Sequence, residues 1–246
     1  MTDSRRATGP LDGIELAIFD KDGTLIDFHH MWSGWVGDLG AQLAAALDDR
    51  GIDEVVFRTM GVDRATGRVL PHGALAATPM ARLREDLVVA VVGHGVRAVD
   101  AEAAIGAAWH APDPLSLARP VTDLVELFGR LRAAGTRIAV ATSDDRDPTE
   151  RTLRHLGIAG LIDGLACADD GELVKPQPHA VRRLCREIGV PAARTAVIGD
   201  SPLDLAMGRA AGVGLVIGVL TGVADRAALA GSADLVVGSV AELLPA

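Results

Sequence analysis

The chain has 246 residues, of which 49% are hydrophobic and 23% charged, a composition typical of a folded protein. This length suits one large domain, or one domain with an insertion. The formal net charge of −9 argues against nucleic acid and membrane partners, because anionic phosphates and lipids would be repelled. An anionic substrate would be repelled as well, unless a bound cation or a ring of backbone amides reverses the local field.

Short apolar runs recur along the chain and predict buried strands. The first covers residues 14–19 and ends at Asp20; later runs cover 137–142, 195–199, 214–219 and 234–237, with a weaker one at 161–167. Helical patterns alternate with these runs, and for the helix that ends before Gly157 we expect Asp147 as N-cap and Pro148 at the first helical position. This alternation predicts a parallel sheet covered on both faces.

Residues 29–116 interrupt the alternation. This stretch is rich in Ala, Leu and Arg, and it predicts several helices without a strand. We therefore expect an α/β fold: a doubly wound, Rossmann-like parallel sheet formed by residues 1–28 and 117–246, with residues 29–116 inserted as a helical domain between its first and second strands.

The sequence predicts neither a secretory signal peptide nor a membrane-spanning helix. The segment MTDSRRATGP lacks the apolar stretch of a signal peptide, and no apolar run reaches the ~18 residues that cross a bilayer. The two cysteines, Cys167 and Cys185, have neither metal-ligand nor redox spacing, so we expect no role for them in catalysis. We expect a cytoplasmic protein, either a monomer or a homodimer.

The segment AIFDKDGTLID places two carboxylates, Asp20 and Asp22, at the mouth of the first predicted strand. Ligands of α/β sheets bind beyond the carboxyl ends of the strands, so a site is expected there. One aspartate could hold a metal or attack an electrophile, and the other could move a proton. Taken alone, the same residues also fit a turn without a catalytic role, capped by Thr24.

Three further polar signals follow predicted strands. Thr142 and Ser143 end the second strand, where hydroxyls and amides suit a phosphate oxygen, although such residues are also common helix caps. Lys175 is one of only two lysines in a chain whose other 22 basic residues are arginines, which indicates a need for a compact charge. Asp200 follows a third strand and suits Mg²⁺, and Asp204 lies in the next helix turn, where it also complements the helix dipole.

This ordered set resembles the four motifs of the haloacid dehalogenase-like superfamily: DxDGT, a strand ending in Thr/Ser, K-P and GDxxxD. The segment GDSPLDLAMGRAAGVGLVIGVLTG is similar to the phosphoglycolate phosphatase-like branch, whose mobile helical cap matches the position of the insertion.

The resemblance implies a phosphatase acting on a small organic phosphate, such as a sugar phosphate or phosphoglycolate. Asp20 would be the nucleophile and Asp22 the acid and base. Mg²⁺ would be held by Asp20, the Asp22 carbonyl and Asp200, with Asp204 in support. The phosphoryl oxygens would be held by Gly23, Thr24, Thr142, Ser143 and Lys175.

Several other protein classes share some of these motifs or this fold. A dehalogenase would not need Asp22, and a phosphonatase would need a cap lysine, which the chain lacks between Asp22 and Lys175. A receiver domain is shorter and orders its motifs differently. A phosphomutase of the β-phosphoglucomutase type has the same core motifs and stays open, as does a binding protein on the same fold. Selectivity for the organic part is expected from the insertion, with His29, Arg64, Arg68 and His72 as candidates.

Overall fold

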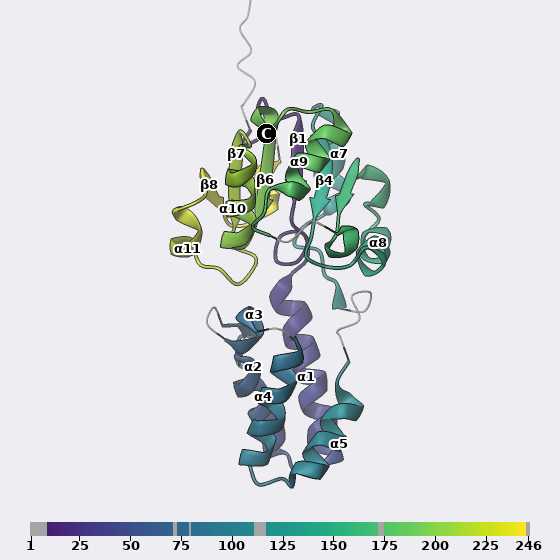
Figure 1. The fold of residues 1–246 in the computed structure, drawn as a ribbon, viewed down its shortest axis with the longest axis vertical. Coiled ribbons are helices and arrows are strands. Elements are labelled where there is room, and N and C mark those ends of the chain that lie inside the picture. The colour runs from purple at the N-terminus through teal and green to yellow at the C-terminus, as the bar shows by residue number, and fades with distance from the viewer. Residues whose placement is uncertain (1–8, 71–72, 79, 111–116, 172–174, 245–246) are drawn as a thin grey trace, which may run out of the picture. The chain divides into compact units, whose positions relative to one another are not determined.

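The computed structural model describes residues 9–70, 73–78, 80–110, 117–171 and 175–244. The chain forms two compact units (Figure 1). Unit 1 combines Met1–Phe28 with Ala118–Ala246, and unit 2 is His29–Leu117. Within the described part of the chain, no helix has both the length and the apolar character needed to cross a membrane.

Unit 1 is built on a parallel sheet of six strands in the order β5-β4-β1-β6-β7-β8. The strands are β1 (Leu16–Phe19), β4 (Arg137–Ala141), β5 (Gly164–Ala166), β6 (Thr195–Gly199), β7 (Leu215–Val219) and β8 (Leu235–Val237). Each lies inside a predicted apolar run, which confirms the predicted sheet. The first strand lies in the middle, because the chain adds later strands on both sides of it.

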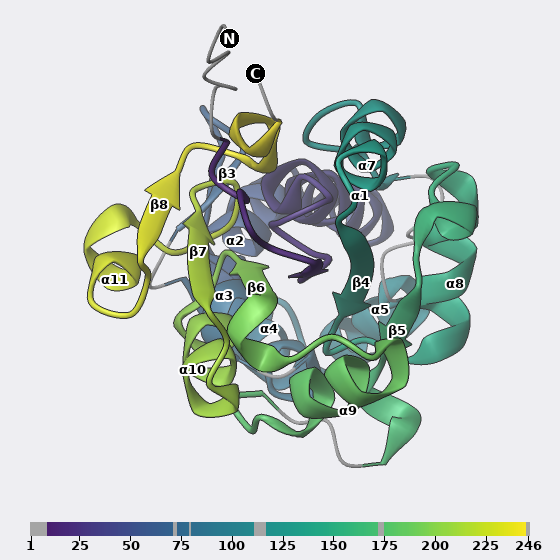
Figure 2. The same cartoon turned by 90° about the horizontal axis from the view of Figure 1, so that it is seen from above.

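Helices cover both faces of this sheet. They are α7 (Leu124–Ala133), α8 (Arg146–His155), α9 (His179–Ile188), α10 (Pro202–Ala211) and α11 (Arg226–Ala230). In β1, Ala17 and Phe19 pack with α7 on one face, whereas Leu16 and Ile18 pack with α9 and α10 on the other. Figure 2 shows α7 on one side of the sheet and α9 and α10 on the opposite side. The continuous apolar runs of the strands reflect this burial on both faces.

The start of α8 differs from the prediction. Its N-cap is Asp145, not Asp147, and the helix begins at Arg146. The amide of Arg146 is satisfied from outside the helix, because it donates to Asp169 Oδ1 at 3.0 Å. A carboxylate 23 residues away in the sequence thus accepts a hydrogen bond from the first turn of the helix, as the side chain of a local N-cap residue was expected to do.

Unit 2 contains α1 (Phe28–Ala46, whose first residue belongs to unit 1), α2 (Gly51–Met60), α3 (Ala74–Ala77), α4 (Met80–Gly93) and α5 (Ala98–Ala108). The expectation that it would contain no strand was wrong. Two short strands, β2 (Val62–Asp63) and β3 (Arg68–Val69), pair in antiparallel fashion. Asp63 closes the turn between them, because its Oδ1 accepts from the amides of Ala65 and Thr66.

Candidate active site

Three predicted site residues follow neighbouring strands of the sheet. Asp20 comes directly after β1, Thr142 after β4 and Asp200 after β6. In the register of the sheet, Phe19 is level with Val140 and with Ile198, so the three strands end at the same edge. The backbone amide of Asp20 donates to Ile198 O at 2.9 Å, which fixes the nucleophile candidate beside β6.

A cluster of buried carboxylates lies at this edge. Oxygen atoms of Asp20, Asp200 and Asp204 all lie within 4.8 Å of one another. Asp204 is held by Ser201, whose hydroxyl donates to Asp204 Oδ2 at 2.6 Å and whose oxygen in turn caps the first turn of α10. Such close like charges are unfavourable unless cations or protons neutralise them.

Lys175 supplies one positive charge to this cluster. Its Nζ lies 2.5 Å from Asp20 Oδ1 and 2.5 Å from Asp204 Oδ1, and its side chain is almost fully buried. Burial alone would lower the pKa of Lys175, but Asp20 and Asp204 outweigh it and raise the pKa. The lysine is therefore held as a cation between the two carboxylates, as expected of the compact charge predicted from the sequence.

Lys175 does not neutralise the whole cluster, and the pKa values of Asp20 and Asp200 are raised. Burial raises the pKa of Asp20 to about 7, with Asp204 adding to the rise and Lys175 opposing it. Burial and the neighbouring Asp20 also raise the pKa of Asp200 well above its usual value. A further cation among these oxygens would favour their ionised forms.

The donor set fits a hard cation. Asp20 Oδ2 is buried and has no hydrogen-bond partner among the described residues, so one oxygen at the centre of the cluster is left for a ligand outside the chain. Carboxylate oxygens are what Mg²⁺ prefers, and it commonly takes only one or two of them together with substrate phosphate. Asp204 was predicted as a supporting residue, and its bonds to Lys175 and Ser201 suit that role.

The loop after Asp20 is compact and close to the cluster. Gly23 has a φ of +84°, and a Cβ on Gly23 or on Gly222 would overlap the Asp200 carboxylate. Thr221 Oγ1 donates to Gly23 O at 2.6 Å and ties the loop to the segment after β7. The absence of a side chain at these two glycines therefore leaves space for the Asp200 carboxylate, and of the two only Gly23 was predicted as a site residue.

The predicted phosphate donors differ in their surroundings. The amide of Gly23 donates to Ile26 O and that of Thr24 to Lys21 O, so both have partners inside the loop. The buried Thr24 hydroxyl has no partner among the described residues. Thr142 is buried and its hydroxyl accepts from the amide of Asp144 at 3.2 Å, while Ser143 is exposed. Their roles toward phosphate stay predictions.

The other lysine of the chain, Lys21, directly follows Asp20 in the sequence. Lys21 Nζ is 2.6 Å from both carboxylate oxygens of Asp22 and 2.9 Å from Asp144 Oδ2. Burial raises the pKa of Asp22, whereas Lys21 opposes the rise. Neither Lys21 nor Asp144 was predicted as a site residue, although the scarcity of lysine in the chain was a signal for Lys21.

The selectivity candidates of unit 2 are placed as follows. His29 Nδ1 accepts from the amide of Val69 at 3.1 Å, which joins the start of α1 to β3. Arg64 pairs with Asp53, and its guanidinium lies 5.0 Å from the centre of the Phe57 ring. Arg68 lies on β3 and is exposed. His72 lies outside the described residues.

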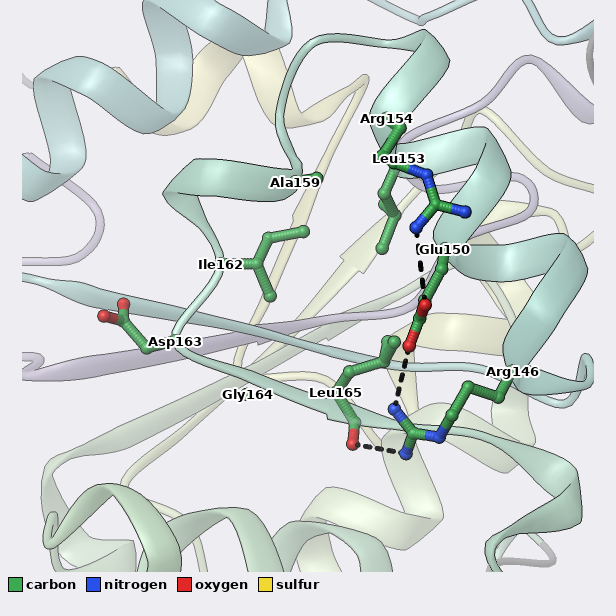
Figure 3. Close-up of a pocket in the computed structure, with 9 residues that line it drawn as sticks. All are labelled: Arg146, Glu150, Leu153, Arg154, Ala159, Ile162, Asp163, Gly164 and Leu165. Carbon is green, nitrogen blue, oxygen red and sulfur yellow. Dashed lines mark hydrogen bonds and ion pairs between the residues drawn. The ribbon is translucent and has the colours of Figure 1, made fainter.

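A cavity of about 310 Å³ lies elsewhere in unit 1, between α8 and β5 (Figure 3). Its charged groups all have partners: Glu150 pairs with both Arg146 and Arg154, and Asp163 pairs with Arg132 outside the cavity. None of its lining residues is a predicted site residue, so this cavity does not belong to the candidate active site.

Comparisons with known proteins agree with these motifs. A model of the haloacid dehalogenase-like hydrolases matches residues 14–212. A phosphoglycolate phosphatase from Rhodospirillum rubrum is 32% identical over 204 residues, which cover 81% of this chain and 77% of the relative.

Two solved structures have the same fold. A haloacid dehalogenase superfamily hydrolase of subfamily IA from Geobacter sulfurreducens has a TM-score of 0.64 at 15% identity and covers 98% of this chain and 97% of its own. A hydrolase of the same superfamily from Deinococcus radiodurans, solved with bound phosphate and sodium, has a TM-score of 0.61 at 24% identity and covers 94% and 93%. With its family model, its curated relative and its fold in agreement, the chain belongs to the haloacid dehalogenase-like hydrolases.

Proposed function

We propose that this hydrolase is a magnesium-dependent phosphomonoesterase that acts on a small organic phosphate through an aspartyl-phosphate on Asp20. The observation that carries the proposal is the gathering of Asp20, Asp200, Asp204 and Lys175 in one buried cluster at the carboxyl edge of the sheet. Family membership and the phosphoglycolate phosphatase relative support the enzyme class, a phosphatase.

In the first step, a carboxylate oxygen of Asp20 attacks phosphorus and the bond from phosphorus to the ester oxygen breaks. The Asp22 carboxyl gives its proton to that oxygen, so an alcohol leaves. Lys175, already 2.5 Å from Asp20, stabilises negative charge on the phosphoryl group as it moves. Thr142 is proposed to donate to a phosphoryl oxygen.

In the second step, the Asp22 carboxylate takes a proton from water. The water oxygen attacks phosphorus, and the bond from phosphorus to the Asp20 oxygen breaks. Inorganic phosphate leaves, and Asp20 and Asp22 return to their starting states. One residue thus serves as acid and then as base, as two consecutive reversed proton transfers require.

The proposed metal site uses Asp20, Asp200 and the Asp22 carbonyl, with Asp204 beside them. When bound, Mg²⁺ would offset the repulsion between the Asp20 carboxylate and the anionic phosphate. Asp20 Oδ2, which has no hydrogen-bond partner among the described residues, and the raised pKa values of Asp20 and Asp200 support a cation there.

The substrate class follows from the relative and from the sequence together. The relative named a phosphoglycolate phosphatase supports a small phosphate monoester, phosphoglycolate or a sugar phosphate among them. Selection of the organic part is proposed to rest with the helical unit 2, as the sequence predicts. Both arginines are exposed, but Arg64 has Asp53 and Phe57 as partners, whereas no ion pair of Arg68 is found among the described residues. Arg68→Ala is therefore expected to change the ranking of substrates more than Arg64→Ala does.

The test is a screen of phosphorylated metabolites with purified protein, read as released phosphate, with Mg²⁺, with a chelator and with Ca²⁺. We expect turnover with Mg²⁺, none with the chelator, and poor turnover with Ca²⁺, which favours larger coordination. Asp200→Asn is expected to raise the Mg²⁺ concentration needed for half-maximal activity. Full activity in metal-free buffer would rule the proposal out.

A further inference from the structure

Lys21 is an unusual residue for the interior of a protein. Its side chain is 2% exposed, and it is among the largest fully buried side chains of the chain. Lysine is almost never fully buried unless it is paired, because removing an ammonium group from water is costly. The buried ammonium group of Lys21, which lies between Asp20 and Asp22 in the sequence, is therefore expected to have anionic partners.

Among the described residues, the ammonium group of Lys21 pairs with carboxylates of unit 1. Its Nζ lies 2.6 Å from Asp22 Oδ1 and 2.6 Å from Asp22 Oδ2, so it faces both oxygens of that side chain. On its other side, Nζ lies 2.9 Å from Asp144 Oδ2. The lysine thus bridges the loop after β1 and the loop after β4.

The second loop is itself anchored at the site. The amide of Asp144 donates to the hydroxyl of Thr142, the residue proposed to contact phosphate, at 3.2 Å. The side chain of Asp144 is half exposed, whereas that of Asp22 is 22% exposed. Lys21 therefore links the Asp22 carboxylate, the more buried of the two, to the loop after β4, which also contains Thr142.

Each of the two lysines of the chain pairs with two carboxylates of the site. Lys175 bridges Asp20 and Asp204, and Lys21 bridges Asp22 and Asp144. All other Lys and Arg residues, 22 of 24, are arginines, and no arginine that the structure describes takes part in either bridge. A lysine suits each bridge because its ammonium is a compact charge that can face two carboxylates, whereas the planar guanidinium of arginine needs more room.

We propose that Lys21 is a positioning residue that holds the Asp22 carboxylate in place for proton transfer to the leaving group. This inference rests on the proposed function, in which Asp22 is the acid and base. Without Lys21, the Asp22 side chain loses the group that faces both of its oxygens, and its carboxylate samples other rotamers. Proton transfer requires hydrogen-bond reach, so it weakens when the carboxylate turns away.

The test uses Lys21→Met, which keeps the length of the side chain and removes its charge, and Lys21→Arg, which keeps the charge. The readout is kcat/KM for aryl phosphates of graded leaving-group acidity and for an alkyl phosphate. This ratio covers the steps up to departure of the leaving group, so the later role of Asp22 toward water does not enter it. Arg183→Met, which removes a paired cation at Asp170, is the matched control.

For Lys21→Met we expect kcat/KM to fall by about 100-fold on the alkyl phosphate, the lower end of what general acid catalysis supplies, and by only a few-fold on p-nitrophenyl phosphate. Lys21→Arg should recover part of the loss, and Arg183→Met should leave both values near those of the wild type. An equal fall on every substrate, or no fall, would overturn the inference. If Lys21→Met does not fold, Asp144→Asn should give the same dependence on the leaving group with a smaller loss.

Crystal structures give a readout independent of turnover. The Asp22 carboxylate should be ordered in the wild type and spread over several rotamers in Lys21→Met. An unchanged Asp22 rotamer in that variant would overturn the positioning role even if the protein hydrolysed no phosphate ester. Conversely, a wild type without activity on any ester would refute the proposed function while leaving this structural comparison decisive for Lys21.

Discussion

Replacing Lys175 with methionine should destabilise the metal-free protein and make its stability depend more strongly on Mg²⁺. In the structure the lysine neutralises Asp20 and Asp204 from 2.5 Å each, with Asp200 close by. Breaking a buried ion pair by removing one partner costs about 3–5 kcal/mol. For a chain of this size, that corresponds to a fall of roughly 6–20 °C in the unfolding midpoint.

Saturating Mg²⁺ should close part of this gap. A ligand at about 100 times its dissociation constant stabilises the folded state by about 2.7 kcal/mol. The variant should gain more than the wild type, because without the lysine the carboxylate cluster has one more uncompensated negative charge for Mg²⁺ to neutralise. Arg194→Met, which removes an exposed ion pair with Glu15, is the control and should cost at most about 1 kcal/mol.

The assay must report on unit 1. All three tryptophans, Trp32, Trp35 and Trp109, lie in unit 2, so their fluorescence does not follow the sheet. Hydrogen exchange of the β1 and β6 amides, measured with and without Mg²⁺, follows the elements that carry Asp20 and Asp200. Equal protection of these strands in wild type and Lys175→Met, under both conditions, would refute the view that the lysine balances the carboxylate cluster.

Two further predictions concern stability away from the cluster. Leu184 is fully buried on α9, so Leu184→Ala should lower the free energy of unfolding by about 2–5 kcal/mol, whereas Val125→Ala at a half-exposed position should change it by less than about 0.5 kcal/mol; urea unfolding checks both. Burial tends to raise the pKa of Asp170, but Arg146 and the amide of Cys167 outweigh it and hold the pKa below its usual value. A depressed carboxyl pKa stabilises the fold above the unfolded-state pKa, and this stabilisation is lost as the pH falls through the folded-state pKa. Asp170→Asn should therefore be less stable than the wild type near neutral pH, and urea unfolding should show the difference closing below about pH 4; a constant difference across that range would contradict it.

The sheet could be predicted because its strands are buried on both faces. Residues 195–199, for example, form β6 as the apolar run indicated. The meeting of Asp20, Thr142 and Asp200 followed from the same pattern, since each residue comes directly after a parallel strand and such strands end at one edge of the sheet.

Features that depend on distant contacts could not be predicted in this way. The start of α8 is set by Asp169, which lies far along the chain from Arg146. The β2–β3 hairpin depends on bonds from the Asp63 side chain to the backbone, within a stretch whose composition favours helices. The pairing of Lys21 with Asp144 joins two loops whose proximity only the folded sheet creates.

The most direct test of the central claim is to identify the residue that carries the phosphoryl group. The protein is mixed with Mg²⁺ and a hydrolysed substrate, quenched in acid and reduced with borohydride, which converts an aspartyl-phosphate to homoserine; peptides are then read by mass spectrometry. We predict homoserine at position 20, only in the presence of substrate, and none in Asp20→Asn, which should fold but not turn over. Modification at another aspartate, or substantial turnover by well-folded Asp20→Asn, would contradict the proposed mechanism.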